Sequence, residues 1–217
     1  MYNVISENKL FAGLSKADVE YALSFFSSRT EEYKRGETLH VGGEKLSAFG
    51  LVISGTVQVG TFDYDGNAII MAIVTKGQSF GESLCFLGRE SSVYVQALSD
   101  TKVVWLSADR IKRLSSDMRD LMLKERFTAV LAAKTLEMND RIQILSKIKL
   151  RDRLITYFSQ NVAKYGNDFK IPLSREDMAV YLGTNRSALS RELGKMRDEG
   201  IIEFDKNRFK VKRHIED

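Results

Sequence analysis

The sequence predicts an α+β protein in which an antiparallel β-roll, a long helix and a winged helix-turn-helix follow one another along the chain. Three observations predict this class. Apolar and polar residues alternate in short, glycine-punctuated runs over residues 33–105, a glycine-free stretch covers 107–165, and a helix-turn-helix pattern covers 174–193. We place the domain boundaries so that the three parts span residues 1–115, 116–146 and 147–217.

Composition and length suit a globular chain of two modest domains. The 217 residues are 43% hydrophobic and 29% charged, which is enough apolar material to bury real cores. No apolar run approaches the roughly 20 residues that a membrane span needs, and the first residues lack the pattern of a secretory signal. We therefore expect a cytoplasmic protein with no membrane partner.

Cysteine and histidine, the usual ligands of zinc and iron, are scarce. The chain has one cysteine, Cys85, and two histidines, His40 and His214, which lie far apart in the sequence. A single cysteine cannot hold an iron–sulfur cluster or a zinc ion by itself. We expect no metal site, no iron–sulfur cluster and no haem, and we expect Cys85 to be a buried apolar side chain.

The same scarcity argues against an enzyme, which is the main competing class. A catalytic barrel would need clustered histidine and carboxylate metal ligands, or a nucleophile beside its base. The sequence offers neither, so we predict no catalytic residues. A nucleotide receptor without DNA contact is the other alternative, but it would end near Leu145 and leave the rest of the chain unexplained.

The first part of the chain begins with a short helical lead-in and continues as strands. Apolar residues at helical spacing form the lead-in: Leu10, Phe11, Leu14, Val19, Leu23 and Phe26. Runs such as LVISGTVQVGTFD and TKVVWLS then alternate as half-buried strands do. Asp65-Gly66 predicts a hairpin turn, because glycine accepts the positive φ that such turns need.

An apolar stripe runs through the glycine-free stretch. Its members are separated alternately by three and four residues: Leu121, Lys124, Thr128, Leu131, Thr135, Met138, Ile142 and Leu145. This spacing is that of a two-stranded coiled-coil seam. The repeat is short and contains polar members, so packing of the stripe on the chain's own roll fits the spacing equally well.

The segment SREDMAVYLGTNRSALSREL, residues 174–193, predicts a helix-turn-helix. Ser174 with Asp177 approximates a capping box that starts the first helix. Gly183 permits the left-handed turn, and Thr184 or Asn185 caps the second helix. Leu189 then returns to the core that the two helices share. An ordinary surface helical hairpin is the less favoured alternative, given the combined spacing.

This arrangement leaves four residues on the outward face of the second helix: Arg186, Ser187, Ser190 and Arg191. Arginine suits a DNA-reading position because its fork can bond guanine O6 and N7 together. We assign base reading to Arg186, Ser187 and Arg191. For phosphate contacts we propose Ser174, Asn185, Ser190, Lys206 and Arg208.

The sequence after Gly200 reads as a β-hairpin wing. IIEFDKNRFKVK alternates around a turn at residues 205–207 and carries four cations: Lys206, Arg208, Lys210 and Lys212. FKIPL, which contains Pro172, predicts a further edge strand. From Lys147 onward the chain has 16 Lys and Arg against 11 Asp and Glu, a net charge of +5, whereas the remainder carries −1. A basic face confined to one end fits phosphate binding.

Three stretches resemble the Crp/Fnr family of bacterial regulators. They are YKRGETLHVGGE with LVISGTVQV, GQSFGESLCF with SSVYVQALSDTKVVWLS, and LGTNRSALSRELGKMRDEGII. The resemblance extends over nearly the whole chain and implies a cyclic-nucleotide-binding-type roll, a long dimerisation helix, a hinge at 146–150 and the winged helix-turn-helix. It favours the dimer seam, with Leu121, Leu131, Thr135, Met138, Ile142 and Leu145 as its members.

The resemblance also implies partners and a mechanism. We expect a homodimer on double-stranded DNA with a two-fold related operator, and RNA polymerase as a further partner if the protein is an activator. An effector at the roll would shift a two-state dimer through the seam helices and the hinge. Ser187 replaces a glutamate that is common in the family, so we do not assume the usual half-site.

Departures from the family pattern bear on the effector. The expected effector pocket contains Gly81, Glu82, Ser83, Arg89, Ser91, Ser92, Met138 and Asn139. In members that bind cyclic AMP, a Gly-Glu pair binds the ribose and an Arg-Ser pair the phosphate, but Ser91 occupies the arginine position here. The adenine-contacting positions hold Met138 and Asn139, and the nearest arginine, Arg89, lies two residues before the expected position. We therefore expect no cyclic AMP response, an unidentified effector, and a structural role for Glu82.

Overall fold

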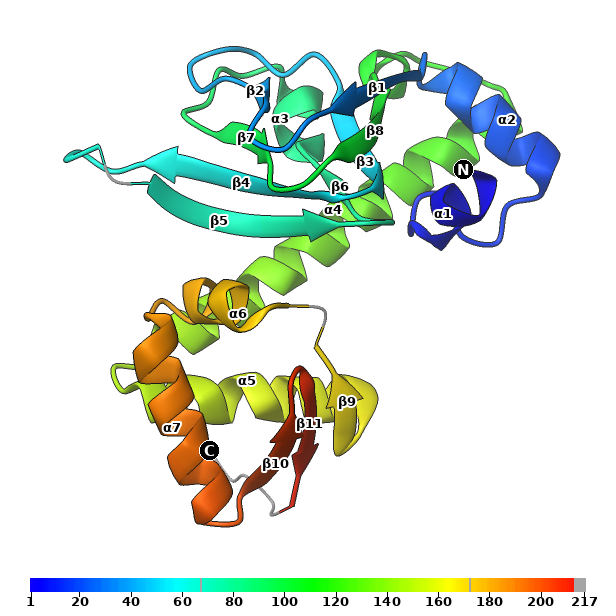
Figure 1. The fold of residues 1–217 in the computed structure, drawn as a ribbon. Helices are drawn as coiled ribbons and strands as arrows, with labels where there is room; N and C mark the ends of the chain where they lie inside the picture. Colours follow the sequence, from blue (N-terminus) through cyan, green and yellow to red (C-terminus); the bar gives the residue numbers. More distant parts are fainter. Residues whose placement is uncertain (67, 172, 213–217) are drawn as a thin grey trace. The chain divides into compact units, whose positions relative to one another are not determined.

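The computed structural model describes residues 1–66, 68–171 and 173–212, and its fold is shown in Figure 1. The chain divides into two compact units, Met1–Lys134 and Thr135–Asp217. The division falls inside one long helix, α4 (Met118–Leu145). The predicted boundaries of three domains stay a prediction.

Two short helices, rather than the single lead-in expected, open the first unit. Helix α1 spans Tyr2–Glu7, and α2 spans Lys16–Phe25 with the Ser15 side chain accepting a hydrogen bond from the amide of Asp18. The apolar residues between and after them are buried in a core with Phe49 and Phe127. The predicted apolar positions are therefore core positions, although several lie in turns.

The roll consists of two four-stranded antiparallel sheets, in the strand orders β1-β8-β3-β6 and β2-β7-β4-β5. The strands are β1 Arg29–Tyr33, β2 Thr38–His40, β3 Phe49–Ser54, β4 Thr56–Phe62, β5 Ala68–Thr75, β6 Ser79–Phe80, β7 Tyr94–Ala97 and β8 Thr101–Leu106. Gly66 has a φ of +83° in the turn between β4 and β5, which confirms the predicted hairpin. The alternating pattern thus predicted the sheets correctly.

One element inside the roll was missed. Helix α3 (Glu82–Leu87) lies between β6 and β7, where the sequence suggested strands only. Gly81 at φ +83° and Gly88 at φ +63° flank it in the left-handed conformation. A helix of six residues is too short for its apolar spacing to stand out against the alternation on either side.

Side chains from both sheets fill the interior of the roll. Val57 and Val95 come from one sheet, and Phe80 and Trp105 come from the other. The rings of Phe80 and Trp105 meet edge to face at 5.5 Å, and the indole N–H of Trp105 donates to the hydroxyl of Tyr33 at 3.0 Å. These aromatic contacts link three strands of one sheet, β1, β6 and β8.

A 3₁₀ turn (Asp109–Lys112) leads into α4. Within the first unit, the buried side of this helix consists of Leu123, Phe127 and Val130, all of which lie off the predicted seam. On the seam, Leu121 is exposed and only Leu131 packs partly against the core. In this unit the core-facing side of α4 therefore differs from the stripe.

The second unit is a winged helix-turn-helix. Helices α5 (Leu150–Tyr165), α6 (Arg175–Tyr181) and α7 (Arg186–Asp198) combine with a sheet of strand order β10-β11-β9. The strands are β9 Asp168–Lys170, β10 Ile202–Asp205 and β11 Arg208–Val211. The predicted strand FKIPL extended to Pro172, which lies outside the described residues. His214 lies outside them as well.

The predicted α+β class with a roll, a long helix and a winged helix-turn-helix is confirmed. One core holds the second unit together and includes Phe158, Leu182, Leu189 and Phe209. No helix within the described parts of the chain combines the length and apolarity needed to cross a membrane.

Candidate nucleic-acid interface

The capping box at the start of α6 is present. The hydroxyl oxygen of Ser174 accepts a hydrogen bond from the amide of Asp177 at 3.1 Å, and the amide of Ser174 donates to the Asp177 carboxylate at 3.2 Å. The Ser174 hydroxyl also bonds this carboxylate at 2.6 Å. The predicted phosphate ligand Ser174 thus already has a local partner that fixes the helix start.

The turn between α6 and α7 has the geometry that the sequence predicted. Gly183 has a φ of +64°, and the amide of Thr184 donates back to the carbonyl of Ala179 at 2.9 Å. Of the two predicted caps, Asn185 is the one used, because its side-chain oxygen accepts from the amide of Ala188 at 2.8 Å. Both ends of the turn are therefore fixed by local hydrogen bonds.

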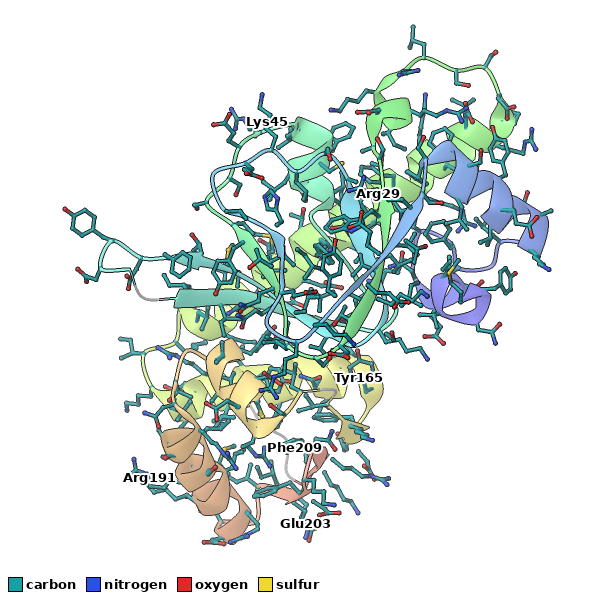
Figure 2. The ribbon with its side chains drawn as sticks, turned by 45° about the horizontal axis from the view of Figure 1, so that its top comes forward. Arg29, Lys45, Tyr165, Arg191, Glu203 and Phe209 are labelled. Carbon is teal, nitrogen blue, oxygen red and sulfur yellow. The ribbon has the colours of Figure 1, made fainter. Side chains whose placement is uncertain are left out.

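Helix α7 presents one face to its own core and the other to solvent. Leu189, Leu193 and Met196 are buried. The predicted base-reading residues Arg186, Ser187 and Arg191, together with Ser190, are all exposed. Figure 2 labels Arg191 on the outer side of this helix. Among the described residues neither Arg186 nor Arg191 has an ion-pair partner, so both guanidinium groups are available to an external anion.

The wing carries four cations, and carboxylates hold two of them. Arg208 forms two hydrogen bonds with Asp168 at 2.8 and 2.9 Å, which lower the pKa of the Asp168 carboxyl. Lys212 forms an ion pair with Glu203. Lys206 and Lys210 are exposed, without ion-pair partners in the described chain. Of the two wing residues predicted to bind phosphate, Lys206 is thus available, whereas Arg208 must share its guanidinium with Asp168.

Arg175, the first residue of α6, contacts the wing. Its guanidinium lies 5.2 Å from the ring centroid of Phe204 and 5.1 Å from that of Phe209, and it donates to the carbonyl of Lys206 at 2.7 Å. Burial lowers the pKa of this guanidinium. These contacts hold the wing turn at a set position relative to α6.

The roll has an open cavity of about 840 Å³. Its lining consists of Thr38, Val41, Gly42, Gly43, Gln58, Phe62, Glu90, Ser91, Ser92, Tyr94 and Gln96. Gln58 and Gln96 alternate along their strands with the buried Val57, Val95 and Ala97, which places the cavity on the outer face of the sheet β2-β7-β4-β5. Of the predicted effector residues, Ser91 and Ser92 line this cavity.

The described lining of the cavity combines aromatic and uncharged polar side chains and contains no cation. The Gln58 amide donates to Gln96 at 2.9 Å, the rings of Phe62 and Tyr94 stack at 4.9 Å, and Glu90 is the one charged residue among the described lining residues. A cyclic phosphate needs a cation or many donors to replace its water. The arrangement suits a neutral or cationic ligand better than an anion.

The predicted effector residues Gly81, Glu82, Ser83 and Arg89 do not line the cavity. Glu82 is 2% exposed, and its Oε2 atom pairs with the Lys134 Nζ at 2.7 Å. Met138 and Asn139 belong to the second unit, where both are exposed. The cavity therefore brings together only part of the predicted set.

Lys134 was missed from the sequence. Its ammonium also donates to the carbonyl of Ser79 at 2.6 Å, while the Oε1 atom of Glu82 is buried with no hydrogen-bond partner among the described residues. A signal existed, because Lys134 follows Phe127 and Val130 by seven and four residues and so lies on the apolar face of α4. A lysine at such a position predicts a buried acidic partner.

Comparisons with known proteins agree with both units. A model of the cyclic nucleotide-binding domain matches residues 30–117, and a model of the Crp-like helix-turn-helix domain matches residues 149–214. The cyclic AMP receptor protein of Thermus thermophilus is 28% identical over 193 residues, covering 89% of this chain and 87% of that protein. The fumarate and nitrate reduction regulatory protein of Escherichia coli K12 is 25% identical over 180 residues, covering 80% and 71%.

Solved structures share the fold. FixK2 from Bradyrhizobium japonicum has a TM-score of 0.64 at 20% identity, with 86% of this chain and 93% of that chain covered. The Thermus thermophilus catabolite activator protein has a TM-score of 0.53 at 24% identity, with 94% of each chain covered. At these identities the similarity concerns the fold alone.

Proposed function

This chain belongs to the Crp/Fnr family of transcription regulators, and on that premise we propose that it binds a two-fold related operator as a homodimer under the control of an effector at the roll. The observation that carries the proposal is the exposed outer face of α7, with two arginines that have no ion-pair partner among the described residues. Such a face, on a helix capped at its start, is what major-groove reading requires.

In the proposed complex, Arg186, Ser187 and Arg191 read base edges. Arginine at the groove floor gives specificity for guanine, whereas phosphate contacts give orientation. We assign phosphate contacts to Ser190, Asn185 and the wing residue Lys206, with Ser174 and Arg208 contributing as far as their partners Asp177 and Asp168 allow. The base-reading role of Arg186 and Arg191 is supported by their exposure and by the absence of ion-pair partners for them among the described residues.

The homodimer is proposed from the stripe on α4. Leu121, Met138, Ile142 and Leu145 are large apolar residues with exposed fractions of 39 to 62%. A second copy of the same stripe would cover them in the manner of a short coiled coil. Two copies are also needed to address two half-sites about one helical turn apart.

For the effector we propose a ligand other than cyclic AMP, bound at the roll. Ser91 stands where the cyclic-AMP-binding pattern has arginine, and no lysine or arginine is found among the described residues that line the cavity. The Thermus thermophilus relative is named a cyclic AMP receptor protein, and we infer that this chain differs from it in ligand. We propose no iron–sulfur cluster, haem or catalytic activity, and RNA polymerase as a partner if the protein activates.

Selection of bound fragments from a random DNA pool tests the proposal. The full-length protein is mixed with the pool, with and without cell extract, and bound fragments are sequenced after several rounds. We expect enrichment of one sequence with two inverted half-sites, and a change in its retention when extract supplies the effector. Failure to enrich any sequence in either arm would contradict a sequence-specific regulator.

A further inference from the structure

Arg153, on the first turn of α5, joins two segments that are distant in the sequence. Its Nε atom donates to the carbonyl of Lys147 at 2.8 Å. Its Nη1 atom donates to the carbonyls of Leu182 and Gly183 at 3.1 and 3.0 Å. One guanidinium therefore holds three backbone oxygens at once.

The three carbonyls lie in two connections between helices of the second unit. Lys147 lies between the end of α4 at Leu145 and the start of α5 at Leu150, the segment predicted to be the hinge. Leu182 and Gly183 form the turn between α6 and α7. Carbonyls at a helix end lack intrahelical partners and carry partial negative charge, so a guanidinium binds them well.

A second observation points to the same junction. A Cβ atom built on Gly183 would lie 3.2 Å from the Leu145 side chain and 3.3 Å from Nη1 of Arg153. The turn of the helix-turn-helix thus packs closely against both the last residue of α4 and the Arg153 guanidinium. Movement at the hinge cannot leave the start of α7 undisturbed.

We propose that Arg153 is a positioning residue that couples the conformation of the hinge to the orientation of the recognition helix. Hydrogen bonds are directional, so a displacement of the Lys147 carbonyl by about 1 Å breaks the set or moves the guanidinium with it. In the second case the turn and α7 move too. The inference rests on the proposed function and adds the route by which an effector signal reaches the DNA-reading face.

Arg151 provides a matched control on the same helix. It also reaches the recognition helix, but through ion pairs with the side chains of Glu192 and Glu199. Replacing either arginine by methionine removes one positive charge and keeps a long apolar stem. Only Arg153→Met removes the link between the hinge and turn carbonyls.

The test measures the affinity of Arg153→Met, Arg153→Lys and Arg151→Met for the selected operator and for random DNA, at a temperature where each variant is fully folded. We expect Arg153→Met to weaken operator binding about tenfold relative to Arg151→Met, with random DNA changed about twofold or less. Arg153→Lys should recover part of the loss, because an ammonium can still bond one or two of the carbonyls.

Hydrogen exchange distinguishes a coupling role of Arg153 from a purely structural one, because only coupling changes the hinge and the turn together. In Arg153→Met we expect faster exchange of the amides in 146–150 and in 183–189 together, and in Arg151→Met no paired change. Equal operator affinity for the two methionine variants would overturn the coupling. Equal losses on operator and random DNA would make Arg153 a phosphate contact instead. If the wild-type protein selects no operator, the proposed function fails, and this is seen before any variant is made.

Discussion

The recognition helix and the roll cavity are both open to solvent, but they differ in charge. Helix α7 presents Arg186 and Arg191 with no ion-pair partner among the described residues, whereas Glu90 is the one charged residue of the described cavity lining. The lysine near the roll's Gly-Glu pair, Lys134, is already paired with Glu82. The comparison teaches that the exposed face of α7 has guanidinium groups available to an external anion, whereas the lysine beside the roll's Gly-Glu pair is already used in an internal ion pair.

The largest effect is expected from variants that disrupt the proposed dimer. Operator binding needs two chains, whereas the roll cavity lies within one chain. Leu131→Asp with Met138→Asp places like charges from both copies against one another on the stripe. We expect monomers in light scattering and a loss of operator binding of more than about 100-fold, because one chain can address only one half-site. Leu131 also packs partly against the core of the first unit, so circular dichroism must show that the variant is folded at the temperature of the measurement.

Aspartates at Ala129 and Leu136 provide the control, because both positions are exposed and lie off the stripe. This double variant should stay dimeric and bind the operator normally. A stable dimer of the Leu131 and Met138 variant would show that the helices pair through another face.

The next expected effect concerns the Glu82–Lys134 pair. Lys134→Met leaves a buried carboxylate without its cation, and we expect a loss of about 2–3 kcal/mol in the free energy of unfolding. The value is below that for a fully buried pair because the Lys134 side chain is 35% exposed. Denaturant unfolding measures it.

Lys134→Arg should retain most of the stability, since a guanidinium can still pair with the carboxylate. Adding Glu82→Leu to Lys134→Met should recover part of the loss, because the buried charge is then gone. An unchanged unfolding midpoint for Lys134→Met would mean that the pair is not structural, and would leave Glu82 available for a ligand.

The recognition region was predictable because its signals are local. The Ser174 cap, the Gly183 turn and the Asn185 cap lie within twelve residues of one another, and each acts on backbone groups a few residues away. The sheets were predictable for the same reason, since alternation is a property of each strand alone.

What the sequence did not show depends on contacts between distant segments. Lys134 reaches Glu82 across 52 positions, and Arg153 reaches Leu182 and Gly183 across 29 and 30. The partners of Arg153 are carbonyls, which every residue has, so no residue type could indicate them. The short helix α3 was not predicted either. Because Glu82 is its first residue, the burial of Glu82 away from the cavity was also missed.

A smaller effect is expected at Arg191, which we propose as a base-reading residue. Arg191→Ala should cost about 1–3 kcal/mol in operator binding, because a guanine edge is left without its partner, and should cost less on random DNA. Arg197→Ala is the control: it also removes an α7 cation, one that pairs with Asp198 at 2.9 Å. Quantitative gel shifts give both affinities. Equal losses on operator and random DNA would move Arg191 from base reader to phosphate contact.

The smallest expected effect is that of cyclic AMP, which should change nothing. A phosphate that enters the roll must give up water, and the cavity lining offers it a carboxylate and two serines instead of a guanidinium. We expect no heat of binding in calorimetry and no change in operator affinity. A micromolar dissociation constant with stronger operator binding would contradict this, and Arg89→Ala would then test whether Arg89 supplies the missing cation.

The central claim is that this chain reads DNA sequence as a homodimer through a basic, exposed helix face. Gel shifts across a series of salt concentrations, on the selected operator and on a scrambled fragment of the same length, test it most directly. We predict two copies per operator, a preference of at least about 10³ over the scrambled fragment, and affinity that falls steeply with salt. Equal affinity for the two fragments at every salt concentration would contradict the claim.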